Sequence, residues 1–374
     1  MKTTVLFGVA LLAAVPAFAK LYGDLPDDSH AWAVHDWIRP KPVKVAPAVK
    51  PGGAPSDAIV LFDGTRESFE RNWCDKNGKP SLWKLGDEGD FYCVPNWKNG
   101  GDIRTRGEFG DCQLHLEYRH EPDVTDGGRG PQMRGNSGVF LMENYEIQVL
   151  ESYHTSQQDC AVDNYTDGQA GAVYAENPPM VNPQRRPGEW QAYDIVFHQP
   201  VWEDEKLVHP GSVTVFFNGV LVQDHWEMEG LTTHCKRRPL APHAKKGPLK
   251  FQDHGCTVHF RNIWIREIPS RWANTTHSVM SAKKDDVMAL RRQTAAALYA
   301  KIADKEAVTV DNVLALGEVI GYANEGEWRE AWKKVSSAYD AKVAAMSEAE
   351  RKAAKADIEK VEKAKAVLKR AGLL

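Results

Sequence analysis

Two glutamates on one predicted strand could carry acid–base chemistry. Residues 145–150 alternate so that Glu146 and Gln148 share a face, and Glu151 follows directly. Because successive strand side chains point to opposite faces, Glu151 joins that face only if a β-bulge follows Gln148. Two carboxylates on one face could flank a glycosidic bond, one protonated as the acid and one ionised. The residues alone favour the alternative that Glu151 ends the strand in solvent and Glu146 is a satisfied polar group, since strand carboxylates are usually solvated.

Other predicted strands carry polar side chains at alternating positions. Glu117 and Arg119 lie opposite an apolar face, and Asp194 and His198 share a face of another strand. The run Gln-Asp-His-Gly at 252–255 ends a strand at a turn, where side chains can project into a cleft. A single histidine is more often a structural hydrogen-bonding residue than a base. Several such groups converging on one sheet face would indicate a site.

Antiparallel strands must position these groups, and residues 57–268 have the pattern of an all-β domain. Residues 112–120 alternate clearly between apolar and polar side chains. The Glu-Asn pair at 143–144 predicts a tight turn. The Asn-Gly pair at 218–219 predicts a two-residue hairpin, because both central positions of that turn need a positive φ. Many strands with few helices predict a mainly β fold, an antiparallel β-sandwich or jelly roll.

Three long polar loops interrupt this pattern, at residues 122–134, 153–169 and 176–189. Loops of this length without secondary structure are commonly the walls of a site. Simple surface insertion is an equally good interpretation.

Residues 269–374 predict a linker and a C-terminal α-helical region, rich in Ala, Lys and Glu. Ser347 and Glu350 form a capping box that opens a helix running to about Ala371, with Gly372 just beyond its end. Positive and negative charges are interspersed, as on a solvated helical surface. We find no catalytic group of residues here and expect an appended helical bundle.

The N-terminal residues 1–19 predict an export signal. A lysine, a short apolar run and Ala-Phe-Ala at 17–19 match the three parts of a cleavable signal peptide. We therefore expect an exported protein, periplasmic or secreted. Residues 20–56 form a Pro-rich leader, whose Trp32 and Trp37 could dock on the domain that follows.

Export would permit disulfides, and the chain has six cysteines. Six cysteines allow about 15 connectivities, and free buried thiols are an equally open interpretation. The cysteines are Cys74, Cys93, Cys112, Cys160, Cys235 and Cys256.

Composition excludes several classes of protein. The 374 residues are 42% hydrophobic and carry a formal charge of -4, so a nucleic-acid surface, which needs a basic excess, is not expected. No apolar run reaches the roughly 20 residues that span a bilayer. The motifs of dinucleotide-binding proteins, P-loop enzymes, zincins and α/β-hydrolases are absent from the sequence.

Several motifs in chain order resemble the 3-keto-disaccharide hydrolase family. They are LFDGT at 61–65, GDCQLHLEYR at 110–119, RGNSGVFL at 134–141, DGQAGAVY at 167–174, FQDHG at 251–255 and FRNIWIRE at 260–267. The resemblance covers roughly residues 57–268 and implies a concanavalin A-like lectin/glucanase sandwich. The spacing of Glu146, Gln148 and Glu151 also resembles the E-x-D-x-x-E strand of laminarinase-type β-glucanases. Gln148 replaces the aspartate that tunes the nucleophile there, which puts ordinary retaining hydrolysis in doubt.

The resemblance implies a sugar substrate that a partner sugar 3-dehydrogenase has already oxidised at C3. The C2 proton of such a sugar is acidic, so a base can remove it and the enolate can expel the C1 substituent. Water can then add to the product. This route needs a base, an enolate stabiliser and a proton donor, but no carboxylate nucleophile.

For this route we assign the base to Glu146 or His254. Arg119 or a bound divalent cation would stabilise the enolate, and Glu151 is a second acid or base. Beyond such a cation, no cofactor is indicated. The remaining polar candidates would bind sugar hydroxyls, and they are Asn136, Gln148, Glu117, His198, Gln252 and Asp253.

Two other functions compete with an enzyme that cleaves (3-keto-)glucosides or disaccharides. The same sandwich could be a non-catalytic carbohydrate-binding module, with exposed aromatic platforms and few titratable groups. It could also be a scaffold whose helical region recruits a partner through an apolar patch. The enzyme instead requires carboxylate, histidine and arginine groups in one pocket.

Overall fold

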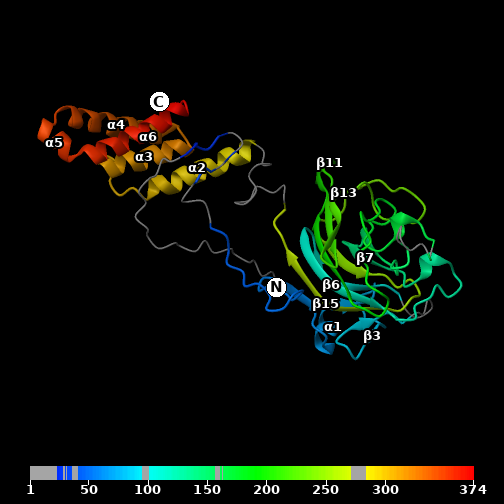
Figure 1. Ribbon diagram of the computed structural model, residues 1–374. Coiled ribbons are helices and arrows are strands. Elements are labelled where there is room, and N and C mark those ends of the chain that lie inside the picture. The colour runs from blue at the N-terminus through cyan, green and yellow to red at the C-terminus, as the bar shows by residue number, and fades with distance from the viewer. Residues whose placement is uncertain are drawn as a thin grey trace. The chain divides into compact units, whose positions relative to one another are not determined.

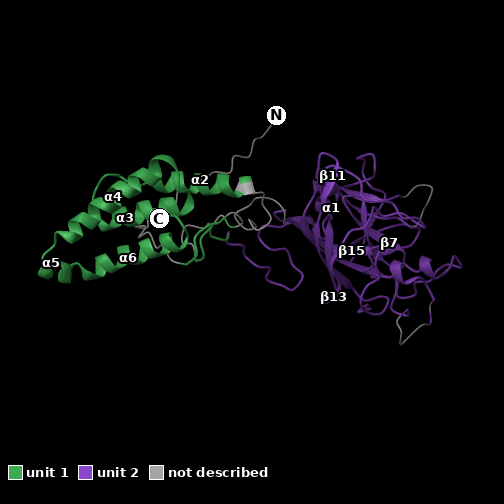
Figure 2. Ribbon diagram, turned by 90° about the horizontal axis from the view of Figure 1, so that it is seen from above, with its two compact units in different colours: residues 1–42, 271–374 green, residues 43–270 purple. Residues whose placement is uncertain are grey.

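The computed structural model describes residues 23–27, 30, 32–35, 41–94, 101–155, 161, 163–270 and 284–374. The chain divides into two compact units, coloured in Figure 2. Unit 2 comprises residues 43–270, and unit 1 comprises residues 1–42 and 271–374. The predicted export signal, Trp37 and Cys160 lie outside the described residues, so export remains a prediction.

Unit 2 is a sandwich of two antiparallel sheets, as the strand pattern predicted (Figure 1). Sheet A has the order β13 (Val220–Glu227), β12 (Ser212–Phe217), β9 (Gln191–His198), β6 (Cys112–His120), β15 (Val258–Glu267), β4 (Phe91–Tyr92), β3 (Lys84–Leu85), with β1 (Ile59–Phe62) also paired to β15. Sheet B has the order β2 (Trp73–Cys74), β5 (Ile103–Phe109), β14 (Gly247–Phe251), β7 (Ser137–Leu141), β8 (Tyr145–Val149). The remaining elements are α1 (Arg66–Asn72), η1 (Pro131–Met133), η2 (Thr166–Gly168) and the hairpin of β10 (Val201–Glu203) and β11 (Lys206–His209).

A dry core lies between the two sheets. Leu116 and Tyr118 of sheet A share one buried cluster with Ile147 and Phe251 of sheet B. Aromatic rings fill its centre, and Phe251 and Phe260 stack with centroids 4.4 Å apart. Because strand side chains alternate, the polar neighbours of these residues lie on the two outer faces of the sandwich, which we call outer face A and outer face B.

Both predicted turns occur where the sequence places them. Asn218 and Gly219 join β12 to β13 with φ values of 51° and 80°, as a type I′ turn requires. The turn between β7 and β8 includes residues 142–144, one more than expected, and Met142 and Glu143 adopt positive φ.

Unit 1 contains a helical bundle built around α3. Its helices are α2 (Lys284–Ala300), α3 (Val310–Tyr322), α4 (Gly326–Ala344), α5 (Glu348–Ala353) and α6 (Lys355–Arg370). The predicted capping box of Ser347 and Glu350 is present. The single helix expected from it is wrong, because the backbone of Ala354 leaves helical geometry and separates α5 from α6.

Trp32 packs on this bundle, with its ring 6.2 Å from that of Tyr322. The expectation that Trp32 docks on the β domain is therefore wrong. The five described cysteines are free, and Cys235 is the exposed one among them. Among the described residues, no helix has the length and apolar character needed to cross a membrane.

We predict that Phe251→Ala destabilises the sandwich by about 3–5 kcal/mol, because a buried aromatic side chain leaves a cavity when removed. Urea unfolding of the full chain measures this loss. Phe216→Ala is the matched control, since Phe216 is 38% exposed and should cost little. Equal losses in the two variants would contradict the packing described here.

Candidate functional site

A row of four side chains crosses outer face B. The strand register pairs Arg104 of β5 with Lys250 of β14, Lys250 with Phe140 of β7, and Phe140 with Glu146 of β8. Their neighbours along each strand are buried, and all of them except Thr105 belong to the core cluster. The two-residue period of a strand therefore places all four on the face away from the core.

Glu146 is the buried carboxyl group of this row, and it is 3% exposed. Its carboxyl lies over Gly138, where an added Cβ would come within 2.2 Å of Oε1. Its main-chain N–H donates to Oγ1 of Thr232 at 2.9 Å. Burial raises the pKa of Glu146 to about 8. The positive charge of Lys250 opposes this increase, and the negative charge of Asp102 adds to it. At neutral pH this side chain is therefore a proton donor.

Lys250 is the fixed cation of the row. Its Nζ donates to Oδ2 of Asp102 at 2.9 Å and lies 3.8 Å from the ring centroid of Phe140. The other oxygen of Asp102 accepts the main-chain N–H of Asp253 at 3.0 Å. The ion pair and the aromatic face thus hold a half-buried positive charge close to Glu146.

A hydrogen-bonded chain of side chains lies near Glu146. The hydroxyls of Tyr165 and Tyr174 are 3.0 Å apart, and Tyr174 Oη lies 2.9 Å from Nδ1 of His234. Nε2 of His234 lies 3.1 Å from Sγ of Cys235. Burial raises the pKa of both phenols, and the charge of Glu146 contributes to the increase. Both tyrosines are therefore hydrogen-bond donors within electrostatic reach of Glu146.

His254 adds an imidazole in the turn after β14. Burial lowers its pKa, and the positive charges of Arg129 and His234 lower it further. At neutral pH His254 is therefore uncharged and able to accept a proton. Asp102 connects His254 to the row, because it pairs with Lys250 at 2.9 Å and accepts the main-chain N–H of Asp253, the residue before His254, at 3.0 Å.

Three glutamine side chains near β7 have buried amide oxygens without a hydrogen-bond partner among the described residues. They belong to Gln132, Gln148 and Gln252. Gln148 is 1% exposed, and its Nε2 donates to Oδ1 of Asn136 at 3.1 Å. Asn136 in turn donates to the carbonyl of Gln132 at 2.7 Å. Because unpartnered buried acceptors are costly, these oxygens are suited to receive the hydroxyl donors of a ligand.

Glu151 does not join Glu146. The β7–β8 register continues without a bulge to the pair of Ser137 and Val149. Glu151 is fully buried, and its two oxygens accept from Nε of Arg134 at 2.8 Å and the N–H of Tyr153 at 2.9 Å. The expectation of a solvated strand end is therefore wrong, and the predicted acid or base is engaged in fixing a loop.

Asp253, an expected hydroxyl ligand, also holds main chain in place. Its two oxygens accept the N–H groups of Gly101 at 2.9 Å and Gly255 at 3.0 Å. These bonds fix the turn that carries His254, so Asp253 positions the site instead of lining it.

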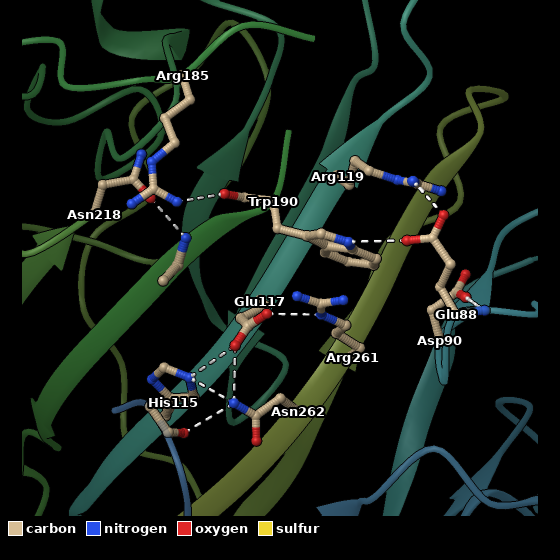
Figure 3. A network of polar contacts seen from close by, with 12 residues as sticks. Glu88, Asp90, His115, Glu117, Arg119, Arg185, Trp190, Asn218, Arg261 and Asn262 are labelled. Atoms are coloured by element: carbon tan, nitrogen blue, oxygen red, sulfur yellow. Dashed lines mark hydrogen bonds and ion pairs between the residues drawn. The ribbon is translucent and has the colours of Figure 1, made fainter. Parts of the chain in front are cut away.

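Arg119 and Glu117 lie on outer face A, on the opposite side of the core from Glu146. Figure 3 shows the network that contains them. Arg119 donates to Glu88 at 2.9 Å and lies 5.0 Å from the ring centroid of Trp190. Glu117 accepts from Arg261 at 2.7 Å. The expectation that Arg119 stabilises an enolate beside Glu146 is therefore wrong, because the strand period turns it away.

His198 is on outer face A as well, with its Nδ1 3.0 Å from Oδ2 of Asp111. Neither His198 nor Glu117 can bind a sugar that contacts Glu146. Of the ten expected site residues, the structure brings Glu146, Gln148, Asn136 and Gln252 together, with His254 beside them.

His115 is the centre of the network on outer face A. Its Nδ1 lies 2.7 Å from Asp194, and its ring stacks on Trp264 with centroids 5.4 Å apart. Burial alone would lower the pKa of His115, but hydrogen bonds to Asp194 and Glu117 raise it to about 9. Burial would likewise raise the pKa of Glu117, but His115, Asn262 and Arg261 lower it to about 2. The charges are mutually satisfied, as in a structural network.

Four members of the site were not predicted from the sequence: Asp102, Lys250, Tyr174 and His234. Lys250 alternates with the apolar Leu249 and Phe251, so the strand pattern could have placed it on the face of Gln252. Tyr174 ends one of the motifs of the family resemblance. His234 lies in an irregular loop, and no pattern in the sequence connects it to Glu146.

The described residues contain no group of three or more His, Cys, Asp or Glu side chains arranged to hold a metal ion. Lys250 is a positive charge that the site offers from its own residues.

The network on outer face A predicts a specific pH dependence of stability. The pKa of His115 is raised in the folded state. The stability that this histidine contributes is therefore complete below about pH 6.5 and is lost as the pH rises through about 9. The stability lost in His115→Gln should therefore shrink between pH 6.5 and 9.5 in urea titrations. Burial lowers the pKa of His120 to about 4, so the loss in the control His120→Gln should stay constant over this range. A constant loss in His115→Gln would contradict the ion pairing.

Comparison with known proteins places this chain in a family. A model described as a 3-keto-alpha-glucoside-1,2-lyase-like domain matches residues 57–266. The structure of a proposed glycosyl hydrolase from Parabacteroides distasonis is 38% identical, covering 64% of this chain and 98% of that chain with a TM-score of 0.55. A second proposed glycosyl hydrolase from that organism is 20% identical, covering 60% of this chain and 100% of that chain with a TM-score of 0.41. No curated protein matches. The family match and the structure that is 38% identical support a carbohydrate-active role. Since the model matches more than half of the sequence, the chain belongs to the 3-keto-alpha-glucoside-1,2-lyase-like family.

Proposed function

We propose that this site cleaves the glycosidic bond of 3-keto-glucosides by removing the C2 proton and expelling the C1 substituent. The observation that carries the proposal is the buried Glu146, protonated at neutral pH beside the fixed cation Lys250. The uncharged imidazole of His254 supplies a base near them. These are the proton donor, charge stabiliser and base that elimination requires.

The first stage breaks the glycosidic bond. Neutral His254 takes the C2 proton, and the electron pair of that C–H bond forms the enolate across C2 and C3. Lys250 stabilises the negative charge on the C3 oxygen. The enolate electrons then form the C1–C2 double bond as the C1–O bond breaks, and the departing oxygen takes the proton of Glu146.

Water completes the reaction. It adds to C1 of the unsaturated ketone while ionised Glu146 takes one of its protons, and protonated His254 returns a proton to C2. Both groups regain their starting states, and the net reaction is hydrolysis. The unpartnered oxygens of Gln148 and Gln252 would accept sugar hydroxyl protons and orient the ring. A sugar 3-dehydrogenase would supply the keto substrate.

The alternative of a binding module has less support. Tyr165 and Phe216 are the large aromatic side chains that are strongly exposed among the described residues. Tyr165 is hydrogen-bonded into a cluster of titratable groups and forms no separate platform. The scaffold alternative needs an apolar patch, and in the described part of unit 1 the strongly exposed large apolar side chains are Val34 and Leu374.

The reaction is tested with 4-nitrophenyl 3-keto-glucoside and its unoxidised parent. We expect release of nitrophenol from the keto sugar and none from the parent, because only the keto sugar has an acidic C2 proton. In heavy water, the sugar product should carry deuterium at C2, detected by NMR. Release from neither compound, or equal release from both without deuterium, would refute the elimination.

The pH profile tests the role of Glu146. Turnover should fall as the pH rises through about 8, because the proton donor is then ionised. Glu146→Gln should lower kcat by about 10²–10⁴-fold and remove this high-pH limb. Arg119→Gln, on outer face A, should keep the wild-type rate and profile. An unchanged high-pH limb in Glu146→Gln would assign the proton transfer to another group.

A further inference from the structure

A cavity of about 260 Å³ adjoins the phenol chain of the site. Tyr174 forms part of its wall, and residues 229–231, 233 and 236–239 form much of the remainder. This loop is anchored to itself, because the N–H of Leu231 donates to the carbonyl of Arg238 at 2.9 Å and Gly230 bridges to Pro239. Main-chain hydrogen bonds therefore hold in place the wall that carries the charged side chains of the cavity.

More positive than negative side chains line this cavity. Three consecutive cations, Lys236, Arg237 and Arg238, face two carboxylates, Glu176 and Glu229. Glu229 lies 3.5 Å from Arg237 in an exposed ion pair.

Glu176 already accepts three hydrogen bonds from neutral donors. It accepts from the N–H groups of Glu229 at 3.2 Å and Gly230 at 2.8 Å, and from Nε1 of Trp226 at 3.4 Å. Among the described residues, Arg237 is the member of this cationic run that forms an ion pair, and Lys236 and Arg238 form none. An arginine and a lysine that share a cavity wall without a counter-ion are suited to bind an anionic group.

The cavity is next to the group that protonates the departing oxygen. Thr232 accepts the main-chain N–H of Glu146 at 2.9 Å, and the following residue, Thr233, lines the cavity. Tyr174 lines it too, and the charge of Glu146 contributes to the pKa of that phenol. A ligand in the cavity thus lies on the Glu146 side of the site.

We propose that this cavity is a subsite for an anionic leaving group, so that the preferred substrates are 3-keto-glucosides whose aglycone carries a carboxylate or a similar acid. Lys236 and Arg238 recognise the acid, and Tyr174 separates it from the sugar. The inference rests on the proposed function for the identity of the sugar, but binding of the acid does not depend on it.

The test compares two ligands of nearly the same shape. For the full chain at low salt, calorimetry should give a dissociation constant for 4-hydroxybenzoate roughly fivefold below that for 4-hydroxybenzamide, the effect of one partly exposed ion pair. The 4-carboxyphenyl 3-keto-glucoside should have a KM lower than the 4-carbamoylphenyl compound by a similar factor. High salt should reduce both differences.

The double variant Lys236→Gln/Arg238→Gln should abolish the preference for the acid, so that the acid and the amide compound have the same dissociation constant and the same KM. Lys44→Gln/Lys50→Gln removes the same charge from exposed positions and should retain the preference. Equal binding of acid and amide by the wild type, or a preference that survives in the first variant, would overturn the subsite. Selective binding of the acid without cleavage of either glucoside would uphold the subsite and refute the proposed reaction.

Discussion

The apolar layer between the two sheets is the constraint on which this molecule depends. A strand that contributes every second side chain to that layer must present the others on an outer face. Polar residues of sheet A and sheet B are therefore separated by a dry core, however close they are in sequence. This geometry divides the titratable groups of the sandwich into two populations that cannot act on the same ligand.

The two populations differ in how completely their charges and hydrogen-bonding groups are paired. On outer face A, His115, Glu117 and Arg261 neutralise one another, and the pKa shifts of His115 and Glu117 favour their charged forms. On outer face B, burial pushes Glu146 and His254 toward their uncharged forms. A network that stabilises its own charges strengthens a fold, whereas groups held neutral among unpartnered amide oxygens are prepared for exchange of protons with a ligand.

The sequence predicts the fold well because periodicity is a local property. The alternation of β6, the Asn218–Gly219 turn and the capping box at Ser347 all depend on residues within a few positions of one another. Faces are also predictable within one strand, as Glu146 and Gln148 demonstrate. The pattern of one strand does not show which sheet it enters, and for that reason Arg119 was assigned to the wrong face.

The loop contributions to the site could not be predicted in the same way. Tyr174, His234 and Asp102 join the site through irregular backbone, whose path depends on long-range packing. The bond of Asp253 to Gly101 is an example, since it joins residues 152 positions apart. Such contacts have no periodic pattern, although turn residues such as Gly255 mark where the chain reverses.

Gly138 has a consequence for how this site can diverge. Its missing side chain leaves the hollow in β7 that accommodates the carboxyl of Glu146, so the floor beneath the acid is made of main chain. A floor of that kind cannot be enlarged or reshaped by substitution, because every replacement adds atoms to it. New substrate preferences must therefore arise in the surrounding loops, while the depth at which the acid sits stays constant.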